Sequence, residues 1–293
     1  MKQYLYILLI VCSGSLSAQP QLFRFPEKNK WGFKNDSGIT VIRPAYACLE
    51  NFSEGLACAG IGVKPEYSMY GYINEKGDWV VKPFFSGAGS FSEGLACVSQ
   101  QGFWGYIDKA GRLALPLQYQ ACDNFVNGYA RVSKTNKWGI IDKKGTLIVP
   151  IGYYKVTNVS DSALGVQKED NSRWQVIDLK QKKISKTTFT KIKEFNTGMA
   201  PARDDSDLYG FISPNGKWLI KPKYTDAESF SEGLAAVEID DQAWGFIDKT
   251  GKLIIPATYS SPGRFKNGMA MMEKNIEYLY INKKGEVLFR CNK

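Results

Sequence analysis

The sequence predicts an all-β protein built as a tandem array of short antiparallel β-meander or hairpin repeats. Three observations predict this fold class. An aromatic residue opens a "WGF"-like or "YGY"-like motif at intervals of 34 to 39 residues along the 293-residue chain. An Asp or Asn and then a Gly follow most of these aromatics at a fixed spacing. No stretch longer than about ten residues has the apolar period of a helix.

The opening aromatics divide the chain into seven full repeats and a final half repeat. They are Trp31, Tyr70, Trp104, Trp138, Trp174, Tyr209, Trp244 and Tyr278. We predict a signal peptide over 1–18 and a single repeat array over 19–293.

A tight turn follows each opening motif. Asp or Asn stands four positions after most of the aromatics, and Gly stands seven positions after all but one, where Gln181 replaces it. An Asp or Asn side chain caps the backbone of its own turn, and Gly takes the positive φ of a bulge at low cost. In "WGFIDKTGKLIIP" (244–256) we therefore predict strands at about 244–248 and 252–255, with Pro256 ending the second.

A second turn is written as "FSEGLAC" at 52–58 and 91–97 and as "FSEGLAA" at 230–236. In "FVNGYA" (125–130), "FNTGMA" (195–200) and "FKNGMA" (265–270) the Phe and Gly persist and the Glu is replaced. The persistent residues make a turn and fill a core. We therefore interpret the motif as an architectural element, and we predict that binding residues lie in the connectors between repeats.

Two arrangements bury the apolar faces of such repeats. Four-stranded meanders form a propeller-like ring, and hairpins stack into an open β-solenoid. Seven and a half repeats favour a seven-bladed ring with the hairpin at 31–43 left over, whereas about 34 residues is short for a blade. We predict the ring and keep the solenoid as the alternative.

The repeat resembles the WG-repeat family, also called KWG repeats, a β-repeat class common in bacterial proteins. The resemblance rests on motifs such as "KWGFKNDSG" (30–38), "WGYIDKAG" (104–111) and "WGFIDKTG" (244–251). It covers about residues 30–290 and implies a repeat architecture with no shared catalytic residues. The repeat at 174–203 lacks the second Gly, the turn Gly and the Pro, and the repeat at 138–167 also drifts. We favour relaxed constraint over a specialised surface as the reason.

The N-terminus has the pattern of a secretory signal. Lys2 precedes an apolar stretch at 4–11, and small residues follow up to a cleavage point after Ala18. A membrane anchor is the alternative. A lipid anchor at Cys12 is disfavoured because Val11 stands where such motifs have a small residue. We predict export to the periplasm, the cell surface or the medium, with no membrane span after signal removal.

The chain is basic, with a formal charge of +9 that falls to about +8 when Lys2 is removed with the signal. A basic protein can bind nucleic acid, anionic lipid or acidic glycan. Export argues against nucleic acid, and we interpret the charge mainly as a solvated basic surface. The lysines concentrate only at 180–193.

Export permits disulfides, and five cysteines remain when Cys12 is set aside. They are Cys48, Cys58, Cys97, Cys122 and Cys291. An odd number leaves at least one thiol free or paired between chains. Cys58 and Cys97 occupy equivalent repeat positions too far apart to bond, so Cys48 and Cys58, which flank one turn, are the better candidates. We interpret most of the five as small buried hydrophobes.

The absence of His excludes Ser-His and Cys-His nucleophile pairs and His-ligated zinc, and no C-x-x-C pair offers a cysteine zinc site. Carboxylates could still pair as in glycosidases. The obvious ones all occupy repeated turn positions, and equivalent positions do not provide unlike environments. They are Asp108, Asp142, Asp178, Asp248, Glu54, Glu93 and Glu232. "RDDSD" (203–207) and "EIDDQ" (238–242) lack the spacing of an EF-hand and are interpreted as solvated loops. We predict no catalytic, cofactor or metal site.

The aromatics that open the repeats are expected to fill the core between repeats. The better surface candidates are off-register: Tyr67, Trp79, Phe103 and Trp218. We predict a non-enzymatic binding or scaffold protein that acts through connectors such as 59–69 and 204–208 on a protein partner. The alternatives are a glycan-binding or glycan-processing envelope protein and a structural assembly component.

Overall fold

The structure is a computed structural model that describes residues 21–62, 67–159, 163–240, 243–274 and 277–292. In this part of the chain every regular element is a β-strand, and the strands form eight antiparallel sheets. The all-β prediction is therefore confirmed. The predicted signal peptide lies outside the described residues.

Each sheet is a meander in which consecutive strands pair. The first contains β1 (Phe23–Glu27), β2 (Lys30–Lys34) and β3 (Thr40–Tyr46). The next three contain β4 (Cys48–Leu49), β5 (Ala57–Ile61), β6 (Met69–Ile73) and β7 (Trp79–Phe85); β8 (Gly87–Ala88), β9 (Leu95–Gln100), β10 (Phe103–Asp108) and β11 (Leu113–Tyr119); and β12 (Ala121–Cys122), β13 (Tyr129–Lys134), β14 (Lys137–Asp142) and β15 (Leu147–Tyr153).

The remaining sheets continue the order. They contain β16 (Lys155–Val156), β17 (Ala163–Gln167), β18 (Trp174–Asp178) and β19 (Lys183–Ile184); β20 (Lys191–Ile192), β21 (Ala200–Arg203), β22 (Tyr209–Ile212) and β23 (Trp218–Tyr224); β24 (Asp226–Ala227), β25 (Ala235–Asp240), β26 (Ala243–Ile247) and β27 (Leu253–Tyr259); and β28 (Met269–Lys274), β29 (Glu277–Asn282) and β30 (Val287–Asn292).

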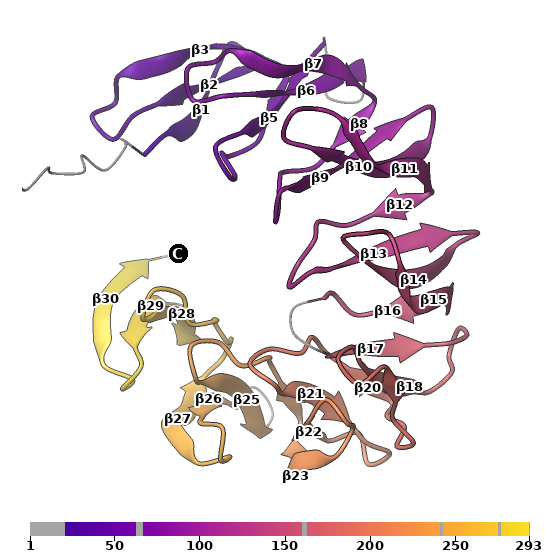
Figure 1. Cartoon of the computed structure of the whole chain (residues 1–293). Coiled ribbons are helices and arrows are strands. Elements are labelled where there is room, and N and C mark those ends of the chain that lie inside the picture. The colour runs from indigo at the N-terminus through magenta and orange to yellow at the C-terminus, as the bar shows by residue number, and fades with distance from the viewer. Residues whose placement is uncertain (1–20, 63–66, 160–162, 241–242, 275–276, 293) are drawn as a thin grey trace, which may run out of the picture.

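The sheets follow one another around a propeller-like arc (Figure 1). The first sheet, drawn in indigo, and the last, drawn in yellow, lie at the two ends of the arc. Among the described residues, no strand of the first sheet pairs with a strand of the last. The predicted propeller-like arrangement is confirmed, but the described residues form eight sheets where seven blades were predicted, and no sheet combines strands from both ends. The N-terminal hairpin is not left over, because β1 joins it to make a sheet.

The opening motif forms a bulged hairpin. Trp244 lies opposite Tyr259 and Phe246 opposite Ile255, with a register shift between the two pairs. The carboxylate of Asp248 accepts backbone N–H bonds from Thr250 and Lys252 at 2.9 and 3.1 Å. The turn chemistry predicted from the Asp-to-Gly spacing is confirmed, and it fixes the pairing of the last two strands in the sheet.

The second position of the motif is Gly because the partner strand comes very close. A Cβ at Gly105 would lie 2.5 Å from the carbonyl oxygen of Pro116, and one at Gly71 would lie 2.3 Å from that of Val81. Both distances are too short for any side chain. The Gly of the motif therefore follows from the bulge that the two strands share.

The second turn is a two-residue hairpin in which both central residues have positive φ. Ser53 and Leu56 exchange backbone hydrogen bonds of 2.9 and 3.1 Å around Glu54 (φ 54°) and Gly55 (φ 84°). This is the type I′ geometry whose twist matches flanking strands. Gly suits its place, whereas Glu in the left-handed region carries a backbone cost.

The core lies between consecutive sheets rather than within one. The aromatic at the third position of the motif packs on the Phe that opens the next second turn: the ring centroids of Tyr72 and Phe91 are 4.7 Å apart, and those of Phe211 and Phe230 are 4.9 Å apart. Each buried cluster combines residues of two neighbouring sheets, as repeat stacking requires.

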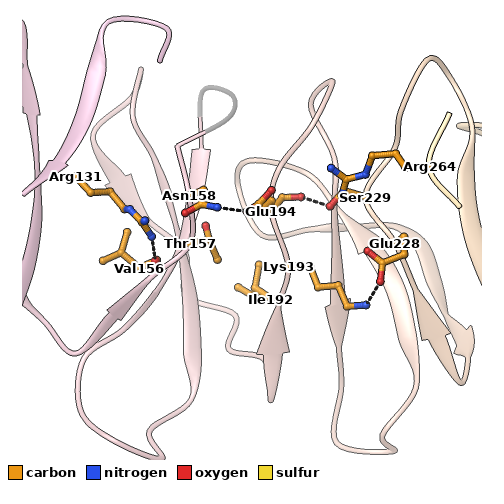
Figure 2. Close-up of a pocket in the computed structure, with 10 residues that line it drawn as sticks. All are labelled: Arg131, Val156, Thr157, Asn158, Ile192, Lys193, Glu194, Glu228, Ser229 and Arg264. Atoms are coloured by element: carbon orange, nitrogen blue, oxygen red, sulfur yellow. Dashed lines mark hydrogen bonds and ion pairs between the residues drawn. The ribbon is translucent and has the colours of Figure 1, made fainter. Parts of the chain in front are cut away.

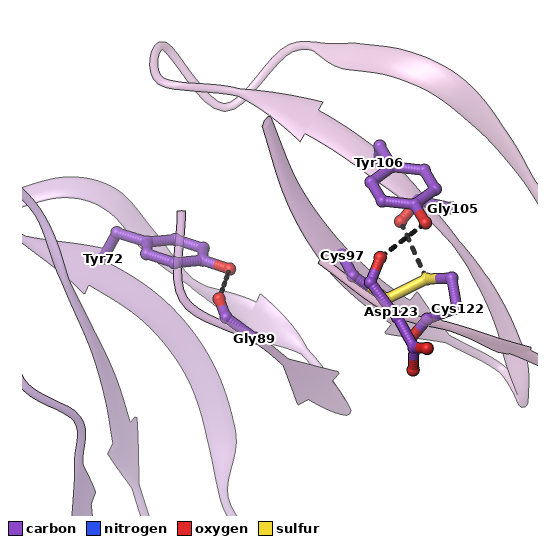
Figure 3. The surroundings of a disulfide bond; sticks show 7 residues. All are labelled: Tyr72, Gly89, Cys97, Gly105, Tyr106, Cys122 and Asp123. Atoms are coloured by element: carbon purple, nitrogen blue, oxygen red, sulfur yellow. Dashed lines mark hydrogen bonds between the residues drawn. A yellow bond between two sulfur atoms is a disulfide. The ribbon is translucent and has the colours of Figure 1, made fainter. Parts of the chain in front are cut away.

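A disulfide joins two sheets, and it is not the one favoured by the sequence. Cys97 of β9 bonds Cys122 of β12, with Cα atoms 6.2 Å apart (Figure 3). The expected Cys48–Cys58 pair is wrong: both are free, because the Cys58 side chain faces the next sheet, with its sulfur 3.6 Å from the carbonyl oxygen of Ala88. Cys291 is also free, so the predicted unpaired thiol is confirmed.

Tyrosine hydroxyls add polar links between the same sheets. The Tyr106 hydroxyl donates to the carbonyl oxygen of Asp123 beside the disulfide, and the Tyr72 hydroxyl donates to that of Gly89, both at 2.7 Å (Figure 3). Burial raises the pKa of both phenols, so they remain neutral donors.

Candidate functional site

The Asp residues singled out by the sequence serve the turns of different sheets. The backbone N–H of Arg112 and other hydrogen bonds lower the pKa of Asp108, and the Thr250 hydroxyl is the largest influence that lowers that of Asp248. Asp142 accepts from two backbone N–H groups at 2.9 Å, as does Asp178. These carboxylates are occupied by their own turns, as the sequence predicted.

The Glu residues of the second turn have a role that the sequence did not predict. The Glu54 carboxylate accepts a 3.0 Å bond from the Gly94 N–H and pairs with Lys109 at 3.1 Å, and both partners belong to the next sheet. Glu93 and Glu232 repeat the arrangement. Each therefore joins two sheets, and the signal in the sequence was the joint presence of Glu and the turn lysine.

The acidic connector at 203–207 is closed by its own contacts. Asp204 accepts bonds from the Ser206 N–H and hydroxyl at 3.0 and 2.7 Å, and Asp205 pairs with Arg173 of the preceding sheet. Residues 241–242 of the other acidic segment and 63–66 of the first connector lie outside the described residues. No group of metal-ligating side chains occurs among the residues that the structure describes.

The aromatics divide as follows. None of the eight that open the repeats is exposed, and most pack against the buried clusters, as expected. Tyr67 and Phe103 are exposed, whereas Trp79 and Trp218 pack edge-on against Tyr46 and Phe189. Only two of the four off-register aromatics are therefore available at the surface.

A groove of about 570 Å³ lies where the first strands of successive sheets end. In Figure 1 the last strands, such as β7, β11 and β15, lie on the outer side of the arc, and sheet order puts the first strands at the opposite edge. We call this cavity the inner groove (Figure 2). It is lined by Arg131, Val156, Thr157, Asn158, Ile192, Lys193, Glu194, Glu228, Ser229 and Arg264.

All the lining residues except Arg131 occupy one of three consecutive repeat positions. Asn158, Glu194, Ser229 and Arg264 each stand at the position before the residue that opens the second turn. The repeat fixes where these side chains lie while leaving their chemistry free to vary. Four repeats thus contribute four different groups to one groove.

Charged groups in the groove are linked across sheets. Lys193 donates to Asp226 and Glu228 of the next sheet, both at 2.8 Å. Burial alone would lower the pKa of Lys193, but these two carboxylates outweigh it and raise the pKa, so the ammonium stays charged. Glu194 accepts from the Asn158 amide, and its backbone carbonyl accepts the Ser229 hydroxyl at 2.7 Å.

Arg264 differs from its neighbours. Its side chain is exposed, and it has no hydrogen bond or ion pair with any described residue. In Figure 2 it lies beside Ser229 at one end of the groove. A guanidinium free of internal partners offers five donors to a carboxylate from outside.

The sequence did not single out this groove, because its residues are spread over more than 130 positions and each looks unremarkable alone. The available signal was a variable position at a fixed place in an otherwise regular repeat. The sequence prediction placed variability in the connectors instead.

Comparison with known protein families shows the family of the chain. The model of the "WG containing repeat" matches residues 31–62, 70–102, 104–138, 138–171, 209–242 and 244–275. This protein belongs to the WG-repeat family. The model leaves 172–208 unmatched, which is where the fifth repeat departs from the pattern. No curated protein matches the sequence of this WG-repeat chain.

Solved structures resemble the WG-repeat array in fold alone. A crystal structure of the eukaryotic initiation factor has a TM-score of 0.62 at 11% identity, covering 94% of this chain and 85% of that one. BamB from Moraxella catarrhalis has a TM-score of 0.41 at 14% identity, covering 90% and 94%. Hsv2p from Kluyveromyces lactis has a TM-score of 0.45 at 9% identity, covering 93% and 95%.

Proposed function

We propose that this WG-repeat protein is an exported, non-enzymatic binding module that holds an acidic segment of a protein partner in the inner groove. The observation that carries the proposal is Arg264, an exposed guanidinium without a partner among the described residues, in a groove lined by five successive repeats. Its neighbours Lys193, Glu194 and Glu228 are engaged with one another's sheets and form a fixed polar wall.

A protein segment suits the groove better than a small apolar molecule. The groove is lined mostly by charged and amide side chains at successive repeat positions, and peptide carbonyl and N–H groups can bond to such a row. A volume of about 570 Å³ falls in the usual range of ligand sites. Specificity then comes from the pairing of Arg264 with a carboxylate on the partner.

The proposal that the protein is exported rests on two features. The N-terminal residues have the pattern of a signal peptide, and the Cys97–Cys122 disulfide suits an oxidising compartment. No described residue belongs to a helix that could cross a bilayer. The mass of the mature protein tests the point: we expect Gln19 as the first residue, and retention of residues 1–18 would contradict it.

The binding proposal is tested with immobilised protein and an envelope extract. We expect a saturable partner that Arg264→Gln weakens by about tenfold or more, since a charged hydrogen bond contributes about 1.5–3 kcal/mol. Arg43→Gln is the matched control, because Arg43 is also exposed and lies on β3 at the outer side of the arc. Equal loss in both variants would contradict a role for the groove.

The same extract separates the alternatives. A glycan ligand survives protease treatment of the extract and is lost after glycosidase treatment, whereas a protein ligand behaves in the opposite way. A structural assembly component forms large species on a sizing column without any ligand.

A further inference from the structure

A second pocket, of about 200 Å³, lies between β15 and β19 on the side away from the inner groove. Val149, Ile177 and Leu179 form its buried floor, and Tyr153 lines it. Lys182 and Lys183 lie at its exposed rim. We call this cavity the outer pocket. Its lining combines an apolar interior with a basic margin.

The outer pocket exists because the fifth repeat departs from the pattern. Elsewhere the turn Gly packs on the outer strand of the preceding repeat: a Cβ at Gly145 would lie 3.1 Å from the Leu115 side chain, and one at Gly111 would lie 3.0 Å from Val81. In the fifth repeat Gln181 stands at this position, and the residue with positive φ is instead Lys182. Val149 therefore lacks the Gly contact that Leu115 and Val81 receive, and it is buried instead beside Ile177 and Leu179.

The last strand of the same sheet is also short. Strand β19 has only two residues, because the Ser185 hydroxyl accepts the Val176 N–H at 3.0 Å in place of a backbone carbonyl. Regular pairing is interrupted there, and the chain next pairs with this sheet at Phe189, opposite Trp174. Leu179 is buried where four of the other turns carry a lysine, two carry Asp36 or Glu75, and one carries Pro214. Two departures in one repeat thus create an apolar recess and supply its apolar floor.

The margin of the pocket is positively charged without compensation. Lys180, Lys182, Lys183 and Lys186 are all exposed, and none forms an ion pair with a described residue. An ammonium group is a compact point charge that suits carboxylate, phosphate or sulfonate oxygens. The apolar floor therefore suits the apolar part of a ligand, and the basic rim suits an anionic group on the same ligand.

We propose that the outer pocket binds an anionic amphiphile, with its apolar chain on Val149 and Leu179 and its head group on Lys182 and Lys183. A dry cavity of about 150 Å³ accommodates benzene, so the recess holds a chain segment of roughly six to eight carbons. The head group is that of a free carboxylate or of an anionic lipid. In this interpretation the drift of the fifth repeat is a local specialisation.

The test is calorimetric titration of the mature protein with decanoate below its micelle concentration. We expect saturable binding of one decanoate, with no binding of acetate or of decyltrimethylammonium, which carry only the head-group charge or the opposite charge. Lys182→Gln/Lys183→Gln weakens binding by about tenfold or more. Lys144→Gln/Lys252→Gln is the matched control: it removes the same charge from exposed turn lysines elsewhere and leaves binding within about twofold.

A second variant fills the recess. Val149→Phe abolishes decanoate binding while circular dichroism shows a folded protein, and the surface lysine variants remain informative if it does not fold. Flotation with phosphatidylglycerol vesicles identifies the source: binding to vesicles alone assigns the head group to a membrane lipid, and binding to monomeric decanoate assigns it to a free carboxylate. Binding to neither, or equal binding by Lys182→Gln/Lys183→Gln, overturns the proposal.

Discussion

Glu54 and Lys109 form an ion pair of 3.1 Å that joins two consecutive sheets across 55 residues of sequence. The same Lys109 ammonium donates to the backbone carbonyl of Glu54 at 3.0 Å. Glu93 with Lys143 and Glu232 with Lys283 repeat the pair at 3.0 and 3.2 Å. The Glu that looked dispensable in the second turn is thus a contact between repeats.

The ion pair accounts for a Glu at a position with an unfavourable backbone conformation. Glu54 occupies the left-handed region, which Asn or Gly adopts more readily. We expect Glu54→Ala to lower the free energy of unfolding by about 1 kcal/mol, because it removes a surface ion pair and a charged hydrogen bond and keeps the strained φ. Urea unfolding measures the change. Glu27→Ala, at an exposed site on β1, should have no effect; equal losses would refute the assignment.

Acid should weaken the same contacts. Burial alone would raise the pKa of Glu54, but the bonds from Lys109 and from the Gly94 N–H lower it, and bonds from Lys283 and the Gly268 N–H lower that of Glu232. A folded-state pKa below the ordinary value of 4.5 stabilises the fold above that pH, and this stabilisation disappears as the pH falls through the lowered pKa.

We therefore expect the melting temperature of the parent protein to fall between pH 5 and pH 3. In Glu54→Gln/Glu232→Gln this fall should be smaller, since neither side chain takes up a proton. Melting curves at half-unit pH steps measure the difference. An identical pH profile in both proteins would show that these carboxylates do not couple to folding.

The regular features were predictable because each has a local cause. The turn at Asp248 follows from a side chain that bonds its own backbone, and that cause is visible in six residues. The Glu54–Lys109 pair and the inner groove at Arg264 were not predictable in the same way. They depend on which sheets become neighbours and on how far apart their edges lie, and the repeat register alone does not state these distances.

The Cys97–Cys122 bond depends both on the repeat register, which sets the positions of the two cysteines, and on the distance between neighbouring sheets. Its cysteines are 25 residues apart and belong to different sheets. We expect Cys97→Ala/Cys122→Ala to lower the free energy of unfolding by about 3 kcal/mol, the usual effect of opening a loop of this length. Unfolding in urea with and without reductant measures it. The exposed Cys291→Ala should match the parent, and a reductant effect in the double variant would contradict the assignment.

The preceding pair of sheets has one of the two cysteines that an equivalent disulfide would need. Cys58 is the repeat equivalent of Cys97, and Ala88 is the equivalent of Cys122. The Cys58 sulfur already lies 3.6 Å from the Ala88 carbonyl oxygen, and that of Cys97 lies 3.1 Å from the Cys122 carbonyl oxygen. We therefore expect Ala88→Cys to form a second disulfide with Cys58 and to raise stability.

Intact mass and thiol titration under non-reducing conditions test this last expectation. The free thiols of the described chain, which are Cys48, Cys58 and Cys291, should fall from three to two in Ala88→Cys. Ala227→Cys is the matched control, because Ala227 holds the same repeat position and faces a sheet whose equivalent residue is Pro201. It should add one free thiol. A free thiol at position 88 would mean that equivalent positions do not have equivalent geometry, and the repeat register would lose its value for placing side chains.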